Sequence, residues 1–187
     1  RLKSSRGKGR DYSLRHCPEN SKTAYFDLDM RYNENFHKII EWSPNDKRVV
    51  AYYLFVARKD VILSKGGWRD LNFGEDYEMN ARVGFDYFIP VITATNLYKM
   101  SRKREKRYVK NKIQYYYRSF RNEVDRIRGI GYNLDEIKPD SQAPILYKLE
   151  LYLAFLVAKL KGIYRYDKEM NNFTKVYLMR IEKLIDY

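Results

Sequence analysis

The stretch Val49–Val56 reads Val-Val-Ala-Tyr-Tyr-Leu-Phe-Val, an unbroken apolar run in the first half of the chain. Valine, tyrosine and phenylalanine favour extended backbone, and an apolar run of this length is typical of a strand that is buried on both faces. We therefore expect Val49–Val56 to form one buried strand at the centre of a sheet.

Shorter elements lie on both sides of this run. Thr23–Phe26 and Phe88–Ile92 are two further strand candidates. Three segments have the features of helices, namely Asn35–Trp42, Arg58–Ser64 and Asp76–Val83. Strands that alternate with helices predict an α/β fold. Residues 1–20 are basic, interrupted by Gly and poor in apolar periodicity, so we expect a loop or a short helical turn there.

The second half of the chain has a helical pattern. Its apolar residues recur at spacings of three and four, which predicts one long amphipathic helix: Val109, Ile113, Tyr116, Phe120, Val124 and Ile127. A linker over Asn133–Pro144 precedes two more expected helices, Ile145–Leu160 and Phe173–Ile185. We expect a core over residues 1–97 and a helical extension over residues 98–187 that packs on it.

Positive charge is concentrated in one segment. The 187 residues carry a formal net charge of +13, and Tyr98–Arg128 alone holds twelve Lys and Arg against three acids, a net of +9. Such a patch attracts nucleic acid, an anionic membrane surface or a phosphorylated small molecule, and charge alone does not choose among them. The 19 Tyr, with many Lys and Arg, also fit a heat-adapted organism.

Cysteine content and hydropathy bear on the compartment. Cys17 is the single cysteine, so no internal disulfide can form. The sequence has no apolar leader and no uninterrupted apolar run of about twenty residues. These features predict a cytoplasmic protein, with peripheral attachment to the inner face of the membrane as the alternative.

Asp27-Leu28-Asp29 follows the first strand candidate and is the first of two acidic motifs. Asp27 and Asp29 lie two residues apart, so at a strand end their side chains share one side while Leu28 points the other way. The pair can offer carboxylate oxygens to one Mg²⁺ or Mn²⁺ ion, which fills its other positions with water and substrate phosphate. Taken alone, the motif also fits a strand-end turn in which Asp accepts backbone N–H bonds.

The second motif reads Gly-Gly-Trp-Arg-Asp-Leu-Asn-Phe-Gly-Glu-Asp-Tyr-Glu over residues 66–78. Its Gly-Gly pair fits a turn, and its Glu-Asp pair fits the first turn of a helix, where the helix dipole favours acids. A carboxylate that follows a Gly-containing loop is also suited to act as a catalytic base. Together the two motifs indicate metal-held phosphate chemistry with a separate base.

In this order the motifs resemble the second half of the catalytic domain of GT-A-fold, family 2-like glycosyltransferases. Such domains show a Gly-containing basic stretch, a strand ending in Asp-x-Asp, a strand and a helix followed by Gly-Gly-aromatic, and a Glu-Asp pair that opens a helix ending near an Arg. The chain supplies Gly7-Lys8-Gly9-Arg10, Asp27-Leu28-Asp29, Gly66-Gly67-Trp68, Glu75-Asp76 and Arg82. The resemblance covers roughly residues 7–95 and implies a Rossmann-like mixed sheet with flanking helices, followed by the helical extension.

The resemblance also implies an activity: inverting, metal-dependent transfer of a sugar from a nucleotide-diphosphate-sugar donor to a hydroxyl of a glycan, lipid or protein acceptor. Asp29, helped by Asp27, would hold Mn²⁺ or Mg²⁺ on the diphosphate. Asp76 would take the proton of the acceptor hydroxyl, and Glu75 would orient the acceptor or cap the helix. The other donor-binding residues would be Lys8 and Arg10 near the phosphates, Gly66 and Gly67 beside the sugar, and Trp68 in the sugar pocket.

The chain departs from this family in two ways. Members normally carry about three further strands before the basic stretch, with an acidic residue that reads the nucleotide base, and residues 1–26 supply none of these. The resemblance thus implies a chain whose first strands are missing or reduced. Many relatives also place a His after the third strand, whereas Ile92–Asn96 contains none. His16, His37 and Cys17 are assigned no chemistry.

A different reading gives the acidic motifs no role beyond turns. The basic segment 98–128 would then form a non-catalytic module for nucleic acid, with Tyr115-Tyr116-Tyr117 stacking on bases among Arg and Lys. The same segment could bind an anionic membrane, helped by the apolar helix Ile145–Leu160 lying in the interface. The simplest alternative is a solvated face of an amphipathic helix.

Overall fold

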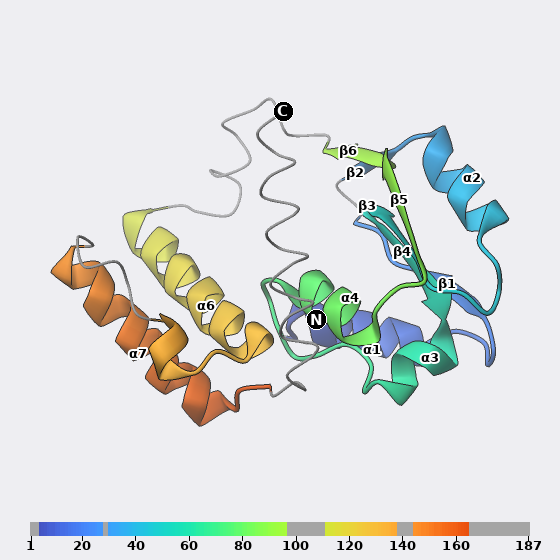
Figure 1. Ribbon diagram of the computed structural model, residues 1–187. Coiled ribbons are helices and arrows are strands. Elements are labelled where there is room, and N and C mark those ends of the chain that lie inside the picture. The colour runs from blue at the N-terminus through green and yellow to red at the C-terminus, as the bar shows by residue number, and fades with distance from the viewer. Residues whose placement is uncertain (1–3, 28–29, 97–110, 138–143, 165–187) are drawn as a thin grey trace. The chain divides into compact units, whose positions relative to one another are not determined.

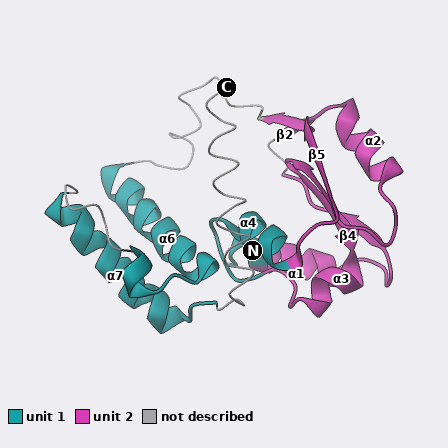
Figure 2. Ribbon diagram, viewed as in Figure 1, with its two compact units in different colours: residues 1–7, 69–82, 111–187 teal, residues 8–68, 83–110 magenta. Residues whose placement is uncertain are grey.

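The computed structural model describes residues 4–27, 30–96, 111–137 and 144–164 (Figure 1). The chain divides into two compact units (Figure 2). Unit 1 holds the described residues of Arg1–Gly7, Arg69–Arg82 and Asn111–Tyr187, and unit 2 holds those of Lys8–Trp68 and Val83–Lys110. This division differs from the one expected at residue 97, because residues 69–82 group with the C-terminal helices.

Unit 2 is built on a mixed four-stranded sheet. The strands lie in the order β1 (Lys22–Ala24), β4 (Leu54–Arg58), β3 (Val49–Tyr52) and β5 (Tyr87–Ile92). Strand β4 runs antiparallel to both of its neighbours, whereas β3 and β5 are parallel. A separate antiparallel pair joins β2 (Met30–Tyr32) to β6 (Ala94–Asn96). A mixed sheet with helices along the chain confirms the predicted α/β class.

The core of unit 2 forms between this sheet and one helix. It gathers Ile39, Val49, Ala51, Leu54 and Val56, with Phe36 and Ile40 packed against it. Helix α2 (Glu34–Trp42) supplies the isoleucines and confirms the helix expected over Asn35–Trp42. It begins at a capping Asn33, whose side chain accepts the N–H of Phe36.

The single strand predicted over Val49–Val56 is wrong, because the run folds back on itself as a hairpin. Ala51 pairs with Leu54, which leaves Tyr52 and Tyr53 as the turn. Tyr53 has a φ of 68°, a left-handed conformation that few residues other than Gly and Asn adopt. Both strands are buried, so the run shows no alternation, and its Tyr-Tyr turn carries none of the usual Gly, Asn or Asp signals.

The loop or short helical turn predicted over residues 1–20 is also wrong, because helix α1 spans the 11 residues Arg6–His16. Polar contacts hold this helix in place of an apolar stripe. Arg15 Nε donates to Asp11 Oδ2 (2.6 Å) within it. The ammonium of Lys59, the first residue of α3 (Lys59–Ser64), donates to the carbonyl oxygens of Arg15 (3.1 Å) and Cys17 (2.7 Å). A cation at this end of a helix opposes the negative pole of the dipole.

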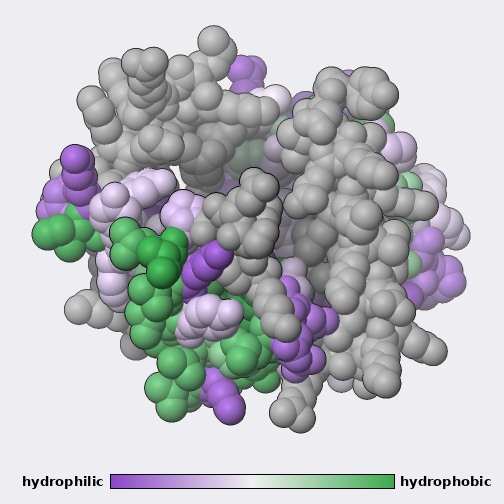
Figure 3. Space-filling model, turned by 60° about the vertical axis from the view of Figure 1, so that its left-hand side comes forward, coloured by the Kyte–Doolittle hydropathy of each residue, from purple (hydrophilic) through white to green (hydrophobic). Residues whose placement is uncertain are grey.

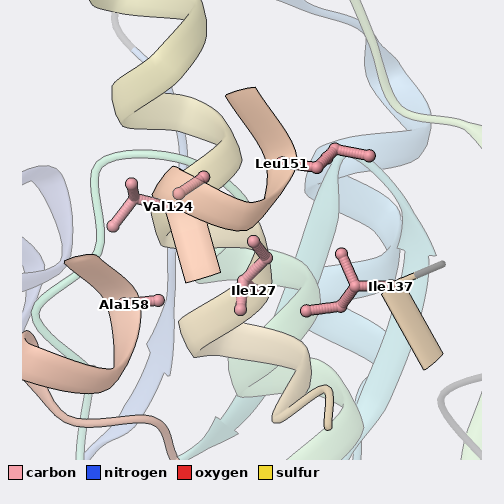
Figure 4. Close-up of a cluster of buried hydrophobic side chains, with 6 residues drawn as sticks. Val124, Ile127, Ile137, Leu151 and Ala158 are labelled. Carbon is pink, nitrogen blue, oxygen red and sulfur yellow. The ribbon is translucent and has the colours of Figure 1, made fainter. Parts of the chain in front are cut away.

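Unit 1 is helical. It contains α4 (Glu75–Val83) as far as Arg82, α6 (Lys112–Ile130), a short 3-10 helix (Leu134–Ile137) and α7 (Ile145–Lys161). Helices α6 and α7 pack side by side around a cluster of buried residues (Figure 4): Val124, Ile127, Ile137, Leu151, Ala154 and Ala158. The helices predicted for this half are confirmed, except that Phe173–Ile185 lies outside the described residues. None of the helices in the described ranges has the length and apolar character needed to cross a membrane.

Helix α6 has clear start and stop signals. The Asn111 side chain accepts the N–H of Gln114 (2.8 Å), and the helix ends at Gly131, which has a φ of 76°. The predicted apolar stripe is buried only in the C-terminal half of the helix. Ile113 and Tyr116 are 79% and 65% exposed, so the N-terminal part of the apolar stripe does not join the core. Val109 lies outside the described residues.

Candidate functional site

Three predicted donor-binding residues lie together in unit 2. Asp27 follows β1, and its Oδ1 accepts a hydrogen bond from Arg10 Nη2 of α1 at 2.6 Å. The Arg10 guanidinium carbon lies 4.9 Å from the ring centre of Trp68 and 4.9 Å from that of Tyr25. We call these four residues the Arg10 cluster. It joins the basic stretch, the first acidic motif and the Gly-Gly-Trp segment.

The aromatic rings hold the Arg10 side chain in one orientation. Tyr25 meets Trp68 edge to face, with ring centres 5.1 Å apart, and Tyr25 also stacks on Phe55 of the sheet. The Arg10 side chain is only 15% exposed, while that of Asp27 is 49% exposed. An arginine between aromatic faces keeps its charge and its fork of N–H donors oriented, which suits recognition of phosphate or carboxylate.

Trp68 itself is buried, with 7% of its surface exposed. Its backbone N–H donates to Asp11 Oδ1 (2.9 Å), so the residue is fixed from both its backbone and its ring. The ring packs inside unit 2 in this structure. The expectation that Trp68 contacts a sugar stays a prediction.

Gly66 and Gly67 end the turn after α3. Both have a positive φ, and their N–H groups donate to Leu63 O (2.8 Å) and Ile62 O (3.0 Å). A Cβ on Gly67 would lie 2.1 Å from Asp11 Oδ1. Gly67 is therefore needed for the close approach of the turn to α1. A role of the two glycines beside a donor sugar stays a prediction.

Lys8 is not brought to the Arg10 cluster. It lies in α1 two residues before Arg10, so the two side chains point to nearly opposite sides of the helix, about 160° apart around its axis. The Lys8 side chain is exposed.

The predicted base and its neighbour belong to unit 1. Helix α4 begins at Glu75, which is 1% exposed, and Arg6 Nη1 lies 3.8 Å from its Oε1. Asp76 is half-buried, and its Oδ1 accepts the N–H of Tyr77 (3.0 Å). Glu75 is thus enclosed with a cation beside it, whereas the Asp76 carboxylate remains partly open to solvent. This difference favours Asp76 over Glu75 as the group that could take a proton from a substrate.

Glu78, one turn further along α4, is the centre of a buried ion cluster. Its Oε1 lies 2.6 Å from Arg82 Nε and 3.2 Å from Arg69 Nε, and its Oε2 accepts from Arg82 Nη2 at 3.0 Å. A carboxylate that is 5% exposed needs such partners, because an unpaired buried charge is costly. The cluster ties the loop before α4 to the helix itself.

That loop, residues 69–74, is held from several sides. Arg128 of α6 donates from Nη1 to Asp70 O (3.0 Å), and the Asp70 N–H donates to the Tyr164 hydroxyl (3.2 Å). The Asn72 N–H donates to Asp125 Oδ2 (2.8 Å), and the Gly7 N–H donates to Leu71 O (2.9 Å). The first turn of α4, which carries Asp76, is therefore held by a firmly anchored segment.

Only Asp27 of the two predicted metal ligands lies among the described residues. Within the part of the chain that the structure describes, no group of three or more His, Cys, Asp or Glu could hold a metal ion. Asp27 already pairs with the Arg10 guanidinium, and Asp29 lies outside the described residues. A single carboxylate paired with arginine is a poor ligand set for Mg²⁺ or Mn²⁺.

Sequence reasoning missed several contacts that build these sites. Tyr25 and Asp11 position Arg10 and Trp68, and Glu78 is joined to Arg69 and Arg82. Glu78 and Arg82 were detectable, since an (i, i+4) acid and base pair on a helix is a sequence signal. The Tyr25 and Asp11 contacts join segments far apart in the chain and leave no local signal.

Three comparisons with known proteins give no match: no protein-family model, no curated protein and no solved structure is similar enough to the chain to count.

Proposed function

We propose that the chain is an inverting glycosyltransferase of GT-A-like fold, which moves a sugar from a nucleotide-diphosphate-sugar to a hydroxyl acceptor. The observation that supports this most is the Arg10 cluster, in which three motif segments far apart in the sequence lie within contact distance. The order of elements agrees: β1 precedes the Asp motif, α3 precedes Gly66-Gly67, and α4 begins at Glu75.

The Arg10 cluster has the chemistry to bind a diphosphate. Its guanidinium offers planar, oriented N–H donors, and the exposed Asp27 carboxylate now occupies one of them. A phosphate oxygen could replace that carboxylate without further desolvation of the arginine, because the aromatic rings already cover its faces. Positive charge there would stabilise the diphosphate as it leaves the sugar.

Asp76 has the chemistry of the base. In an inverting transfer the acceptor hydroxyl loses its proton as its oxygen attacks the anomeric carbon, and the nucleoside diphosphate leaves from the opposite face. The partly open Asp76 carboxylate, fixed at the start of α4, can accept that proton. Mn²⁺ or Mg²⁺, bound through Asp29, is part of the proposal, and the binding experiment includes it.

Donor binding tests this assignment. Arg10→Gln should weaken binding of the favoured donor among UDP-, GDP- and dTDP-sugars by about tenfold or more, because a charge-assisted contact to the diphosphate is lost. Isothermal titration calorimetry, with and without Mn²⁺, measures the change. Arg58→Gln is the matched control, since Arg58 lies in the same unit and pairs with Asp60 (2.7 Å) away from the Arg10 cluster. Equal affinities for the two variants would contradict the assignment.

A second candidate function, nucleic-acid binding, rests on α6. Tyr115, Tyr116 and Tyr117 are 54%, 65% and 68% exposed, next to a segment rich in Lys and Arg. Exposed aromatic rings among cations are the usual means of holding single strands. Fluorescence anisotropy with single-stranded oligonucleotides separates the two functions, because Tyr116→Ser and Tyr117→Ser should affect only this one.

A further inference from the structure

Helix α7 carries two apolar stripes. Its inner stripe, formed by Leu151, Ala154 and Ala158, is buried against α6 and the short 3-10 helix. A helix at the surface of a globular unit normally turns polar residues away from such a stripe. Helix α7 does not.

Its outer stripe consists of leucines that the structure leaves exposed. They are spaced by three, four, three and four residues, and between 54% and 88% of each is exposed: Leu146, Leu149, Leu153, Leu156 and Leu160. Figure 3 shows the corresponding apolar surface, broken by only a few hydrophilic side chains. A contiguous row of exposed leucines of this kind is typical of an interaction site on a soluble protein.

Cations border the outer stripe on both sides. Because each residue advances a helix by about 100°, Lys148 and Lys159 fall on one edge of the stripe and Lys161 on the other. Glu150, the single acid of α7, falls on the same edge as Lys161, so the basic edge of the stripe is the one that carries Lys148 and Lys159. Long lysine side chains at the edge of an apolar face can bury their methylenes and extend their charge to a polar boundary.

This charge pattern decides which of two partners fits the outer stripe: a second copy of the chain or a lipid surface. In a pair of α7 helices from two copies of the chain, leucines at this spacing could interdigitate, but the lysines at the edges would face one another without enough acids to offset them. The whole chain has a net charge of +13, which adds to the repulsion between copies. An anionic lipid surface matches both the apolar stripe and the net positive charge of α7, in which lysines outnumber acids by three to one.

We propose that the outer face of α7 docks on the surface of a bilayer that contains anionic lipids. The leucines enter the boundary between headgroups and acyl chains, and the lysines meet the lipid phosphates. With 17 residues and a basic border, α7 lies along the surface and does not span it. The proposal rests on the burial pattern of unit 1 and is independent of the sugar transfer proposed above.

Vesicle binding tests the proposal with the full 187-residue chain. Co-sedimentation should show binding to phosphatidylcholine vesicles with about one-third phosphatidylglycerol and much weaker binding to phosphatidylcholine alone. Leu149→Gln with Leu156→Gln should weaken binding by about tenfold or more, because two apolar side chains no longer enter the lipid. Leu134→Gln is the matched control, since Leu134 is a comparably exposed leucine of unit 1 outside α7.

A second pair of variants tests the charge. Lys148→Gln with Lys159→Gln should weaken binding to the anionic vesicles several-fold and reduce its dependence on salt, while Lys38→Gln in unit 2 should not. Circular dichroism of each variant checks that the helices are intact. Two results would overturn the proposal: no binding of the folded chain to anionic vesicles, or light scattering in which the leucine variants convert a dimer to a monomer with lipid binding unchanged.

Discussion

Two glycines of α1, two residues apart, differ in the space around them. A Cβ on Gly7 would lie 1.7 Å from the carbonyl oxygen of Arg69, whereas a Cβ on Gly9 would meet nothing within 4 Å. The close approach at Gly7 also carries its hydrogen bond to Leu71 O. The two positions therefore form a matched pair for testing how α1 contacts the loop before α4.

We predict that replacement by Ala changes the free energy of unfolding in opposite directions at the two glycines. Gly7→Ala should lower the free energy of unfolding by about 2 kcal/mol or more, because backbone must shift to admit the methyl group. Gly9→Ala should raise it by about 0.5–1 kcal/mol, since alanine is the better helix former at a site with room. Urea unfolding measures both values. Similar effects at the two positions would show that α1 does not approach the loop as described.

At the residue scale, the sequence indicated part of the candidate site. Arg10, Asp27 and Trp68 were selected from motif order, and they do lie together. Lys8 was selected for the same reason and points elsewhere, because only the helical conformation of α1 reveals which residues share a side. Polar and cation-aromatic contacts between distant segments depend on the fold, so Tyr25 and Asp11 could not be selected beforehand.

The hairpin between β3 and β4 is under local strain at one residue. Tyr53 adopts a φ of 68° and is 53% exposed, so its side chain contributes little packing to offset a left-handed conformation. Tyr53→Asn should raise the free energy of unfolding by about 0.5–1 kcal/mol, because Asn tolerates this conformation better.

Thermal unfolding followed by circular dichroism measures the effect at Tyr53. Tyr87→Asn provides the control, since Tyr87 is a comparably exposed tyrosine within β5, where extended backbone disfavours Asn. This control should be destabilising. A loss of stability for Tyr53→Asn as large as that for Tyr87→Asn would contradict the strained turn.

A bidentate ion pair fixes the start of β5. Arg48 donates from Nη2 to Asp86 Oδ1 (2.9 Å) and from Nε to Asp86 Oδ2 (3.0 Å), and its backbone N–H adds a third bond (2.7 Å). These bonds lower the pKa of Asp86 from 3.8 to about 2. The ionised carboxylate is therefore favoured by the folded chain.

This pKa shift predicts an acid-dependent loss of stability. A carboxyl whose pKa is lower in the folded chain stabilises the fold above its ordinary pKa of 3.8, and this contribution is lost as the pH falls towards about 2. We expect about 1 kcal/mol from Asp86, because solvent partly screens the pair. In Asp86→Asn, urea unfolding should show a smaller decrease of stability over this pH range. An unchanged pH dependence would contradict the prediction.

At the element scale, periodicity predicted the helices and failed at the hairpin. Helices α2, α6 and α7 have caps or apolar spacings that the sequence displays, and their bounds agree closely with those expected. Strands β3 and β4 are buried on both faces, which removes the alternation that would separate them. Helix α1 was missed because it has no apolar stripe, and it is held by contacts of Asp11 and Lys59 together with the buried Leu14.

At the scale of the whole molecule, the residues proposed for sugar transfer are divided between the two units. The Arg10 cluster belongs to unit 2, and Asp76 belongs to unit 1. This division gives a clean separation of variants, because a change at Asp76 should leave the Arg10 cluster intact. The exposed leucine stripe of α7 is a third, separate feature of unit 1.

Release of nucleoside diphosphate from UDP-, GDP- and dTDP-sugars in the presence of hydroxyl acceptors measures the proposed sugar transfer itself. We predict release from one donor by the native chain, and a decrease of about a hundredfold or more in Asp76→Asn with donor affinity retained, because a general base is lost while binding is not. Asp135→Asn, an exposed acid elsewhere in unit 1, should release it at the native rate. Donor binding without release from any donor, or equal release by Asp76→Asn, would contradict the proposed role of Asp76 in sugar transfer.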